Sequence, residues 1–501
     1  MTSPFFRRAL HVATLAGTLI LAQAAWADGP PAATAKHPSP PIIAELSDPP
    51  LLGDKDGVLY VRDSADRLRL YPRGELALQG HGFLGDNTAS LSADDALADL
   101  GPRAFVRHAR FELGGELFKR VAFDASLDLV ANPALDGAQA DSRHTRVALV
   151  DAWGSVDAGR GLSLRLGVFQ APFSLENTTR SNDLPLMERN VATRFVVPGQ
   201  KVLGAALSSV SNRNLLRVDV GAFAAESLDP GRFQRSFDGI AHVSFYPVGF
   251  RPMRDFQVGF SLRFGARNLR DSTGDLGAIT SGQGFAFWRP TRDTADGRAL
   301  HIMPAKGQQA GSLELRLPIS AFVLRSEVAL VHRNTRESFG GAENAFSERR
   351  GELWGLGWYA EASVWLLQLL GVIEGEIPVF GEYPRNEHLE VATLSVPPNR
   401  YGPEIAFMVA SVNASYDSAS RSGVEPTPPI ADDIQVLQLT LGINYWHTRR
   451  FKLSLNLSDY IAKGSGGSQN LAKVPGSLGP EAQRTDAISL YEIGARTTLS
   501  F

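Results

Sequence analysis

The chain has 501 residues, of which 44% are apolar and 21% are charged, and it contains no cysteine. The absence of cysteine excludes a disulfide-stabilised scaffold and any thiolate metal site. A mean hydropathy of -0.10 is too polar for a bundle of membrane-spanning helices. A formal net charge of -3 provides no basic footprint for nucleic acid.

Residues 1–27 are typical of an export signal. Arg7 and Arg8 precede an apolar stretch that ends near Leu21, and small residues lead from there to Ala27. This order of basic, apolar and small residues predicts a signal peptide that is cleaved after Ala27. The mature chain is therefore expected outside the cytoplasm.

Residues 28–66 are rich in proline. Proline lacks the amide donor that helices and central strands require, so we expect a semi-extended periplasmic tether here. The remaining residues, 67–501, are expected to form one domain. The prolines of the tether include Pro30, Pro31, Pro38, Pro40, Pro41, Pro49 and Pro50.

After the signal peptide, the longest apolar run lies around residues 364–373. It is about half the ~20 residues that a helix needs to cross a bilayer. If the exported chain enters a membrane, it must do so as strands.

Several segments alternate strictly between apolar and polar residues. Between 451 and 458, Phe451, Leu453, Leu455 and Leu457 alternate with lysine, serine and asparagine. The segment 255–267 repeats the pattern. Strands of about ten residues with this period are typical of a transmembrane β-barrel, in which one face meets lipid and the other meets water. A soluble β-sandwich is disfavoured because its strands are about half as long.

The pattern predicts an all-β protein, a transmembrane antiparallel β-barrel of about sixteen strands. An even number places both chain ends on the periplasmic side. The predicted strands lie at 68–84, 103–118, 120–131, 145–157, 162–171, 201–211, 214–226, 236–247, 254–268, 309–318, 320–333, 354–370, 404–416, 434–446, 450–463 and 486–501.

Short turns and long loops alternate between these strands, as barrel topology requires. One connection does not fit, because residues 371–403 should form a periplasmic turn. It is either an elaborated turn or a missed strand pair, which would give eighteen strands. Aromatic residues near strand ends are expected to form interfacial girdles: Trp288, Trp354, Trp358, Tyr359, Trp365, Tyr445 and Trp446.

The last strand ends on an aromatic residue. Tyr491, Ile493, Leu499 and the terminal Phe501 share one alternate face. This ending resembles the signal that the outer-membrane barrel assembly machinery reads, with Phe501 as its key residue.

A longer motif lies at the end of the segment 162–171. The sequence from Gly167 through Phe169, Pro172 and Phe173 to Glu176 follows the pattern G-x-F-x-x-P-F-x-x-E. It resembles the phosphate-selective porin O and P family, as do residues 357–363 and 439–446. The resemblance implies a sixteen-stranded barrel, usually a homotrimer, in which the third loop, at about 171–200, narrows the pore and basic residues attract anions.

Arginines on the inward faces of the predicted strands are candidates for an anion pathway, because guanidinium groups match the oxygens of phosphate. Acidic residues on the same faces make salt bridges an alternative, and only 8 of the 50 basic residues are lysines, unlike the lysine-rich constriction of the family. The candidates on the strands are Arg110, Arg165, Arg217, Arg263, Arg267, Arg316 and Arg325. Those in or beside the third loop are Arg180, Glu188, Arg189, Arg194 and Lys201.

These observations predict a porin of the bacterial outer membrane, through which small hydrophilic solutes diffuse passively. Phosphate, polyphosphate or other oxyanions are the expected solutes. No enzyme activity, cofactor or metal is expected, and the lipid bilayer is the expected surroundings. A non-selective porin, or one for sugars or carboxylates, is an alternative.

Two alternatives come from other classes. One is a barrel phospholipase with its serine, histidine and asparagine on the outer face and His108 or His242 as its base, which the absence of a G-x-S-x-G motif does not exclude. The other is a structural barrel that is plugged by residues 269–308 or by the proline-rich tether.

Overall fold

The computed structural model describes residues 51–500 with gaps. The segments outside the description are 1–50, 56–57, 85–101, 132–145, 180, 198–200, 212–215, 226–235, 247–255, 268–275, 289, 294–298, 320, 340–348, 373–400, 419–430, 449, 467–487 and 501. The expected signal peptide, most of the tether and Phe501 therefore lie outside the described residues.

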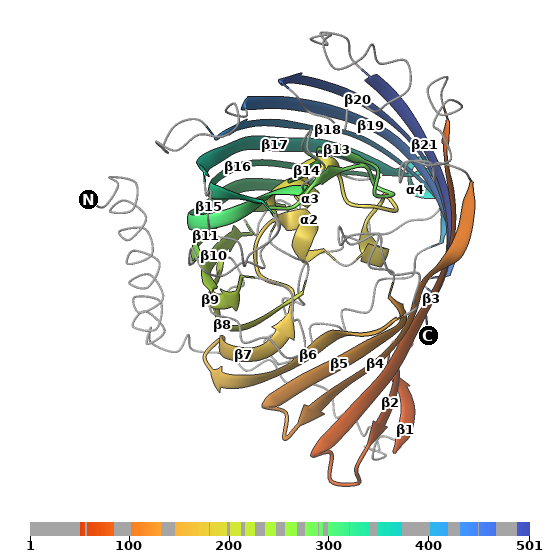
Figure 1. Ribbon diagram of the computed structural model, residues 1–501. Helices are drawn as coiled ribbons and strands as arrows, with labels where there is room; N and C mark the ends of the chain where they lie inside the picture. Colours follow the sequence, from red (N-terminus) through yellow and green to blue (C-terminus); the bar gives the residue numbers. More distant parts are fainter. Residues whose placement is uncertain are drawn as a thin grey trace.

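Sixteen antiparallel strands form a closed barrel (Figure 1). Each strand pairs with its neighbours along the chain, and the last strand, β21, pairs with β3 from Tyr491↔Leu84 to Ser500↔Glu75. Closure leaves the wall without a free edge. The strands are β3 (Leu68–Leu84), β4 (Arg103–Leu117), β5 (Val121–Ala131), β6 (Arg146–Gly159), β7 (Leu162–Phe169), β8 (Val202–Val210), β9 (Leu216–Ala224), β10 (Phe237–Phe245), β11 (Gln257–Arg267), β15 (Ala299–Ile319), β16 (Phe322–Phe339), β17 (Arg349–Trp365), β18 (Gly402–Asp417), β19 (Ala431–Thr448), β20 (Phe451–Gly466) and β21 (Ile488–Ser500).

The barrel has the inverted polarity of a membrane protein. On β20, Leu453, Leu455 and Leu457 are 40%, 47% and 46% exposed, whereas Lys452 and Ser454 on either side of Leu453 are buried. Apolar side chains thus cover the outside of this strand, and polar ones point into the barrel. This confirms the interpretation of the alternating segments as transmembrane strands.

All sixteen predicted segments are strands, and the ring closes without a seventeenth or eighteenth. The bounds differ most at β15, which begins at Ala299 instead of 309, so part of the expected loop 269–308 belongs to the wall. β17 ends at Trp365, and Leu366–Leu369 form the short helix α4. Most of the long connection 371–403 lies outside the described residues.

The end of the expected tether is a β-hairpin. Its strands β1 (Leu52–Lys55) and β2 (Val58–Arg62) pair with each other, and β2 pairs with β3 at Val61↔Leu70. Among the described residues, β21 pairs with β3 from Glu75 onwards, and β2 pairs with β3 ahead of that point. The hairpin therefore supplies backbone hydrogen-bonding groups to the start of β3.

Two connections from the same rim enter the barrel. The first, between β7 and β8, carries α2 (Leu175–Thr178), the 3₁₀ turn η2 (Ser181–Asp183) and α3 (Val191–Val196). Figure 1 shows α2 and α3 inside the ring of strands. The second lies between β11 and β15 and carries the small hairpin of β12 (Ile279–Thr280) and β13 (Ala286–Trp288), followed by β14 (Thr291–Asp293). We call residues 170–197 the inner loop and residues 276–288 the second insert.

Among the described residues, no helix is both long and apolar enough to cross a bilayer.

Candidate functional site: the constriction inside the barrel

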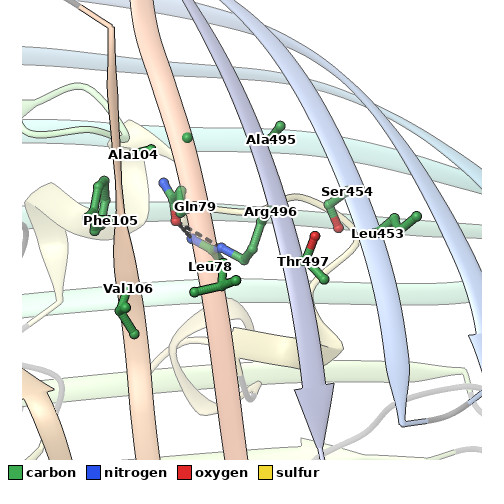
Figure 2. A pocket seen from close by; sticks show the side chains of 11 residues that line it. Leu78, Gln79, Ala104, Phe105, Val106, Leu453, Ser454, Ala495, Arg496 and Thr497 are labelled. Carbon is green, nitrogen blue, oxygen red and sulfur yellow. Dashed lines mark hydrogen bonds between the residues drawn. The ribbon is translucent and has the colours of Figure 1, made fainter.

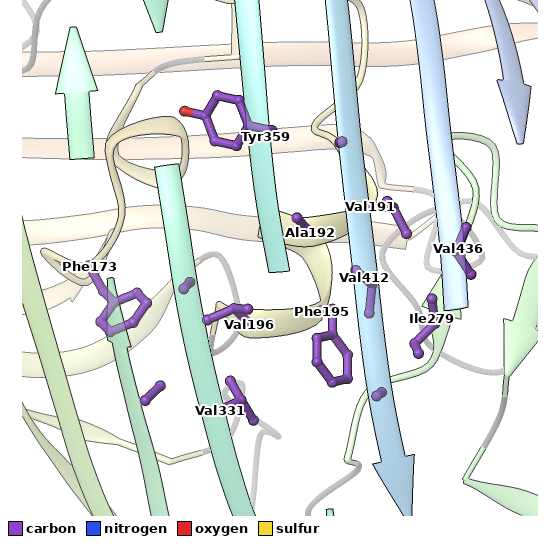
Figure 3. Close-up of a cluster of buried hydrophobic side chains, with 14 of the residues drawn as sticks. Phe173, Val191, Ala192, Phe195, Val196, Ile279, Val331, Tyr359, Val412 and Val436 are labelled. Carbon is purple, nitrogen blue, oxygen red and sulfur yellow. The ribbon is translucent and has the colours of Figure 1, made fainter. Parts of the chain in front are cut away.

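The inner loop is held by an apolar core within the barrel. Figure 3 shows Phe195 and Val196 of α3 among Val331 of β16, Val412 of β18 and Ile279 of the second insert. All five side chains are buried. The loop and the insert therefore pack as one body against one side of the wall.

The strand behind α3 departs from the expected polar inner face. On β18, alternate inward residues are apolar and almost fully buried, and they are Ala406, Met408, Ala410, Val412 and Ala414. The rule of polar residues inside fails on this strand because its inner face meets the loop instead of water.

Glycines on the inner face of the wall make room for the loop. A Cβ atom at Gly355 would overlap the Phe195 ring, and one at Gly442 would lie 2.5 Å from Leu186. A Cβ atom at Gly494 would lie 2.6 Å from Met187. These glycines are needed because larger residues would keep the loop off the wall.

The motif between Pro172 and Glu176 shapes the start of the loop. Phe173 is fully buried, and Ser174 has a φ of 75°, in a region that residues other than glycine seldom adopt. The Ser174 hydroxyl caps α2 by accepting a hydrogen bond from the Asn177 backbone N–H at 3.3 Å. Burial raises the pKa of the Glu176 carboxyl, which receives hydrogen bonds from Asn190.

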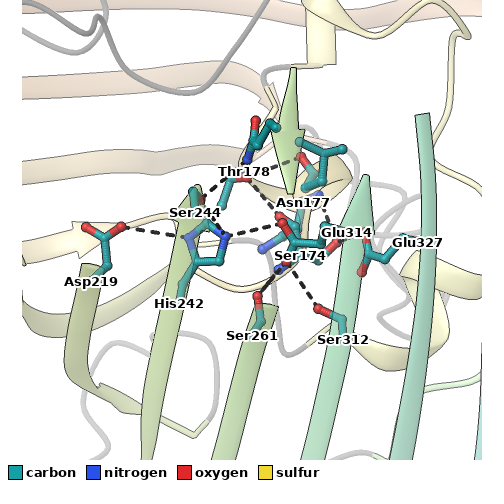
Figure 4. Close-up of polar contacts among 12 residues, drawn as sticks. Ser174, Asn177, Thr178, Asp219, His242, Ser244, Ser261, Ser312, Glu314 and Glu327 are labelled. Atoms are coloured by element: carbon teal, nitrogen blue, oxygen red, sulfur yellow. Dashed lines mark hydrogen bonds and ion pairs between the residues drawn. The ribbon is translucent and has the colours of Figure 1, made fainter. Parts of the chain in front are cut away.

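A polar network joins Ser174 to the wall (Figure 4). Its hydroxyl donates to Glu327 Oε2 at 2.8 Å, and its backbone N–H donates to Ser261 Oγ at 3.1 Å. Ser261 donates in turn to Glu314 Oε1 at 2.6 Å, and His242 Nε2 lies 3.2 Å from Glu314 Oε2. The network fixes the loop where it leaves β7.

His242 also bears on the enzyme alternative, because Ser244 Oγ lies 3.1 Å from its Nε2 atom and Asp219 Oδ2 lies 3.8 Å from its Nδ1 atom. These residue types are those of a hydrolase triad. However, Ser244 is fully buried and the same Nε2 atom faces Glu314. The other candidate base, His108, contacts Asp128 at 2.8 Å. We interpret both histidines as members of wall networks.

Wall side chains donate hydrogen bonds to the backbone of the inner loop. Lys452 Nζ donates to Leu184 O at 2.9 Å, and Asn444 Nδ2 donates to Pro185 O at 2.7 Å. Arg496 Nη1 donates to the Met187 carbonyl at 2.7 Å. Loop carbonyls that would otherwise be buried without a partner are satisfied in this way. Three strands, β19, β20 and β21, contribute these anchors.

The second insert is tied to the same part of the barrel. Gln79 Nε2 on β3 donates to Gln283 Oε1 at 2.9 Å, and the Gly282 backbone N–H donates to the Tyr460 hydroxyl at 2.9 Å. Arg194 Nη1 of the inner loop donates to the Ser281 carbonyl at 2.5 Å. The inner loop, the insert and the wall thus share polar contacts as well as an apolar core.

All seven arginines of the predicted strand pathway lie on inner faces, and most are matched by carboxylates. Arg263 and Arg267 share Asp238, each with a contact of 2.7 Å. Arg165 lies over the Trp153 ring at 4.2 Å, and Arg316 is buried. The other pairs are Arg110 with Asp128 at 3.6 Å, Arg217 with Asp219 at 2.7 Å and Arg325 with Glu361 at 3.9 Å. Salt bridges, the alternative to an anion pathway, therefore account for most of these arginines. The role of the seven arginines in an anion pathway stays a prediction.

The predicted constriction residues have different surroundings. Arg189 donates to three carbonyls of its own loop, including Thr179 O at 2.9 Å, so it shapes the loop. Lys201 contacts Asp151 at 2.8 Å. Arg180 lies outside the described residues. Glu188 and Arg194 lie together in a group that we describe next.

A group of arginines lies around one carboxylate of the inner loop. Glu188 contacts Arg496 through Oε1 and Arg107 through Oε2, the latter at 3.4 Å, and the charge of Arg194 also acts on it. Burial opposes ionisation of Glu188, but the guanidinium groups outweigh burial and lower its pKa to about 2. We call Arg107, Glu188, Arg194 and Arg496 the arginine–glutamate cluster.

Strict alternation from Arg110, which is expected on the inner face, would place Arg107 on the outer face. A β-bulge between Ala77↔His108 and Leu78↔Val106 leaves Arg107 unmatched and turns both it and His108 inward. Figure 2 shows the same wall from close by, where Arg496 donates a hydrogen bond to Gln79. A pocket of about 650 Å³ lies here, and Leu78, Val106 and Leu453 are among the residues that line it. Arg103 and Arg107 are out of phase with Arg110 in a period of two, and this is a sequence signal that could have indicated the bulge.

The aromatic residues expected to form an interfacial girdle differ in exposure, and the girdle stays a prediction. Trp354 is 56% exposed on the outer face and Tyr445 is 39% exposed. Trp288, Tyr359, Trp365 and Trp446 are buried. Trp288 Nε1 donates to Asp432 at 3.2 Å inside the barrel. Trp288 was misplaced because the second insert folds inward. Among the described residues, no group of three or more histidine, aspartate or glutamate side chains could hold a metal ion.

Comparisons with known proteins agree with the resemblance seen in the sequence. The family model of phosphate-selective porin O and P matches residues 88–257, which include the inner loop and its motif. No curated protein matches the chain.

Solved structures of outer-membrane proteins are similar at low sequence identity. The outer membrane channel DcaP of Acinetobacter baumannii is 9% identical with a TM-score of 0.49, covering 88% of this chain and 99% of that one. A loop-deletion mutant of OmpT from Vibrio cholerae is 7% identical with a TM-score of 0.46, covering 87% and 100%. A trimer form of OmpT is 9% identical with a TM-score of 0.42, covering 86% and 100%.

Proposed function

We propose that the protein is an outer-membrane porin through which small hydrophilic solutes diffuse passively. The proposal depends on one observation above all, which is that a connection from one rim folds into a closed sixteen-stranded barrel and is anchored there by wall side chains. Such a loop narrows the lumen without closing the pore. The family match over residues 88–257 covers this loop and supports the same conclusion.

We further propose that the pore prefers anions, and in particular oxyanions such as phosphate or carboxylates. The support comes from the arginine–glutamate cluster, where three guanidinium groups act on a single loop carboxylate. The paired arginines elsewhere on the wall contribute less, because their charge is balanced by a neighbouring carboxylate. The selectivity of the pore therefore depends on the constriction more than on the whole wall.

Planar-bilayer recording of the refolded, full-length mature protein tests both statements. Discrete conductance steps are expected for a porin, and in a KCl gradient the reversal potential is expected to lie on the chloride side. Conductance steps with a reversal potential at zero or on the potassium side would contradict the anion preference but support the porin proposal. The absence of conductance steps would contradict the porin proposal itself.

A plugged structural barrel is the second candidate, because the inner loop and the second insert pack into one apolar core. In that case deletion of residues 276–288 would create conductance in a protein that had none. A porin is expected to conduct before the deletion and to conduct more after it.

As the family resemblance implies, we propose that the protein assembles as a homotrimer within the lipid bilayer. Native mass spectrometry of the detergent-solubilised protein measures this directly, and a monomer as the main species would contradict it.

A further inference from the structure

We propose that the Glu188 carboxylate is a tethered occupant of a carboxylate-binding site formed by Arg107 and Arg496, and that a small organic carboxylate in transit displaces it. The inference rests on the proposed porin function and specifies the solute class and how binding is limited. The site takes a group with two planar oxygens, because each oxygen of Glu188 faces a different arginine.

The backbone on both sides of Glu188 has anchors other than this carboxylate. Wall donors hold the carbonyls of Leu184, Pro185 and Met187, which precede it, and Asn190 after it is bound by Glu176. The side chain of Glu188 can therefore leave its arginines while the backbone stays anchored. A solute could occupy the vacated position without unfolding the constriction.

The charge around the site favours an anion. The charges of Arg107, Arg194 and Arg496 act on Glu188. Two further carboxylates lie near the cluster, since Glu75 acts on Arg496 and Glu492 acts on Glu188. Because the pKa of Glu188 is low, its carboxylate stays ionised at neutral pH and competes with solutes at all times. Competition by a tethered group lowers the apparent affinity of a solute in proportion to the effective concentration of that group.

A second polar group lies beside the site. His81 is 9% exposed, its Nδ1 atom is buried without a hydrogen-bond partner among the described residues, and its ring contacts Phe83 and Phe105 edge-on. The charges of Arg103, Arg107 and Glu188 all act on this imidazole. His81 thus offers one more hydrogen-bonding atom to a bound anion.

Weak binding has a use in a pore. A solute must be attracted strongly enough to enter and weakly enough to leave. Two buried arginines facing an anion without competition would hold it and slow its exit. The tethered carboxylate keeps the site occupied between solutes and lowers the barrier to release, because Glu188 replaces the departing group.

The experiment measures the block of chloride current by sodium succinate in planar bilayers, at constant KCl and pH 7. The variants are Glu188→Gln, which removes the competing charge, and Glu188→Asp, which keeps the charge on a shorter side chain. Asp151→Asn is the matched control, because it removes a lumen carboxylate that contacts Lys201 and lies outside the cluster. Isothermal titration of succinate into the detergent-solubilised proteins provides a readout that does not need conduction.

In Glu188→Gln the half-blocking concentration of succinate is expected to fall about tenfold, with a smaller fall in Glu188→Asp and no change in Asp151→Asn. Arg107→Ala added to Glu188→Gln is expected to remove the gain. Equal changes in Glu188→Gln and Asp151→Asn, or no change in either readout, would overturn the inference. Stronger block by inorganic phosphate than by succinate in Glu188→Gln would overturn the assignment to carboxylates.

The outcomes separate this inference from the porin proposal. If the parent does not conduct but titration shows tighter succinate binding in Glu188→Gln, the carboxylate site is supported and the porin proposal is contradicted. If the parent conducts and Glu188→Gln binds succinate no more tightly, the porin proposal is supported and the role of Glu188 as a tethered occupant is contradicted.

Discussion

Glu176 joins the two halves of the inner loop through Asn190. Its Oε1 atom accepts a hydrogen bond from the Asn190 backbone N–H at 3.2 Å, and its Oε2 atom accepts a second from the Asn190 side-chain amide. Asn190 in turn caps α3 by accepting from the Thr193 backbone N–H at 2.9 Å. One carboxylate at the end of the sequence motif therefore fixes where the second helix of the loop begins.

We expect Glu176→Ala to loosen the inner loop while leaving the barrel intact. The change leaves the buried Asn190 donors without an acceptor, at a cost of about 1–3 kcal/mol. Single-channel records should become noisier, with a higher mean conductance. Glu176→Gln keeps one acceptor oxygen and is expected to lie between parent and alanine. Identical records for all three proteins would contradict the role of this carboxylate.

Gly355→Ala is expected to push α3 away from β17. The added Cβ would overlap the Phe195 ring, and such overpacking costs about 1–3 kcal/mol. The measurements are thermal unfolding in detergent and single-channel conductance. Gly154→Ala is the control, because a Cβ there meets nothing within 4 Å. Adding Phe195→Leu to Gly355→Ala should restore part of the stability, and a failure of this rescue would show that the clash lies elsewhere.

Asp238→Asn tests the paired arginines of the wall. Arg263 and Arg267 are buried and share this carboxylate. Loss of the charge leaves two guanidinium groups uncompensated, which costs about 3–5 kcal/mol. We expect a lower unfolding temperature together with greater anion selectivity. In the triple variant Asp238→Leu, Arg263→Met and Arg267→Met, stability should recover because the two arginines are removed together with their carboxylate. An unstable triple variant would show that the charges themselves are required.

The stability of the constriction is expected to fall in acid. Burial raises the pKa of Glu188, but Arg107, Arg496 and Arg194 outweigh this and hold it at about 2, below the ordinary 4.5. A depressed pKa stabilises the folded state fully above pH 4.5, and this contribution of about 3 kcal/mol is lost as the pH falls towards 2.

Limited proteolysis of the inner loop between pH 5 and pH 2, with an acid-stable protease, measures this loss. Cleavage of the parent should accelerate in that window. Glu188→Gln has no carboxylate to protonate at this position, so its curve should be flatter. Parallel curves for the two proteins would assign the acid sensitivity to other groups.

The sequence predicted the wall of the barrel well because the signal is local. Apolar and polar residues alternate over about ten positions, and each strand can be recognised without knowing its neighbours. The start of β15 was not predicted. Its first ten residues precede the predicted strand 309–318 and lack clear alternation of apolar and polar residues. The hairpin of β1 and β2 was not expected, because the prolines before residue 51 dominate the composition of the segment.

The site was predicted less completely. The third loop and its motif were recognised, and Glu188 and Arg194 were among the candidates. Arg107 was missed because a bulge shifts its side chain to the other face, and a bulge depends on how two strands pair. The packing of the inner loop against Gly355 and Gly442 was also missed. A sequence pattern within one strand does not show which loop residues will face its glycines.

By itself, the amino-acid sequence determined that the strands cross a membrane and which of their faces meets lipid, because a period of two follows from the geometry of a single strand. Only the tertiary structure decided that sixteen strands close the ring, that two connections fill part of it and that Arg107 and Arg496 meet at Glu188. Those contacts join residues up to several hundred positions apart. Their partners are set by packing and charge in three dimensions, which no local pattern records.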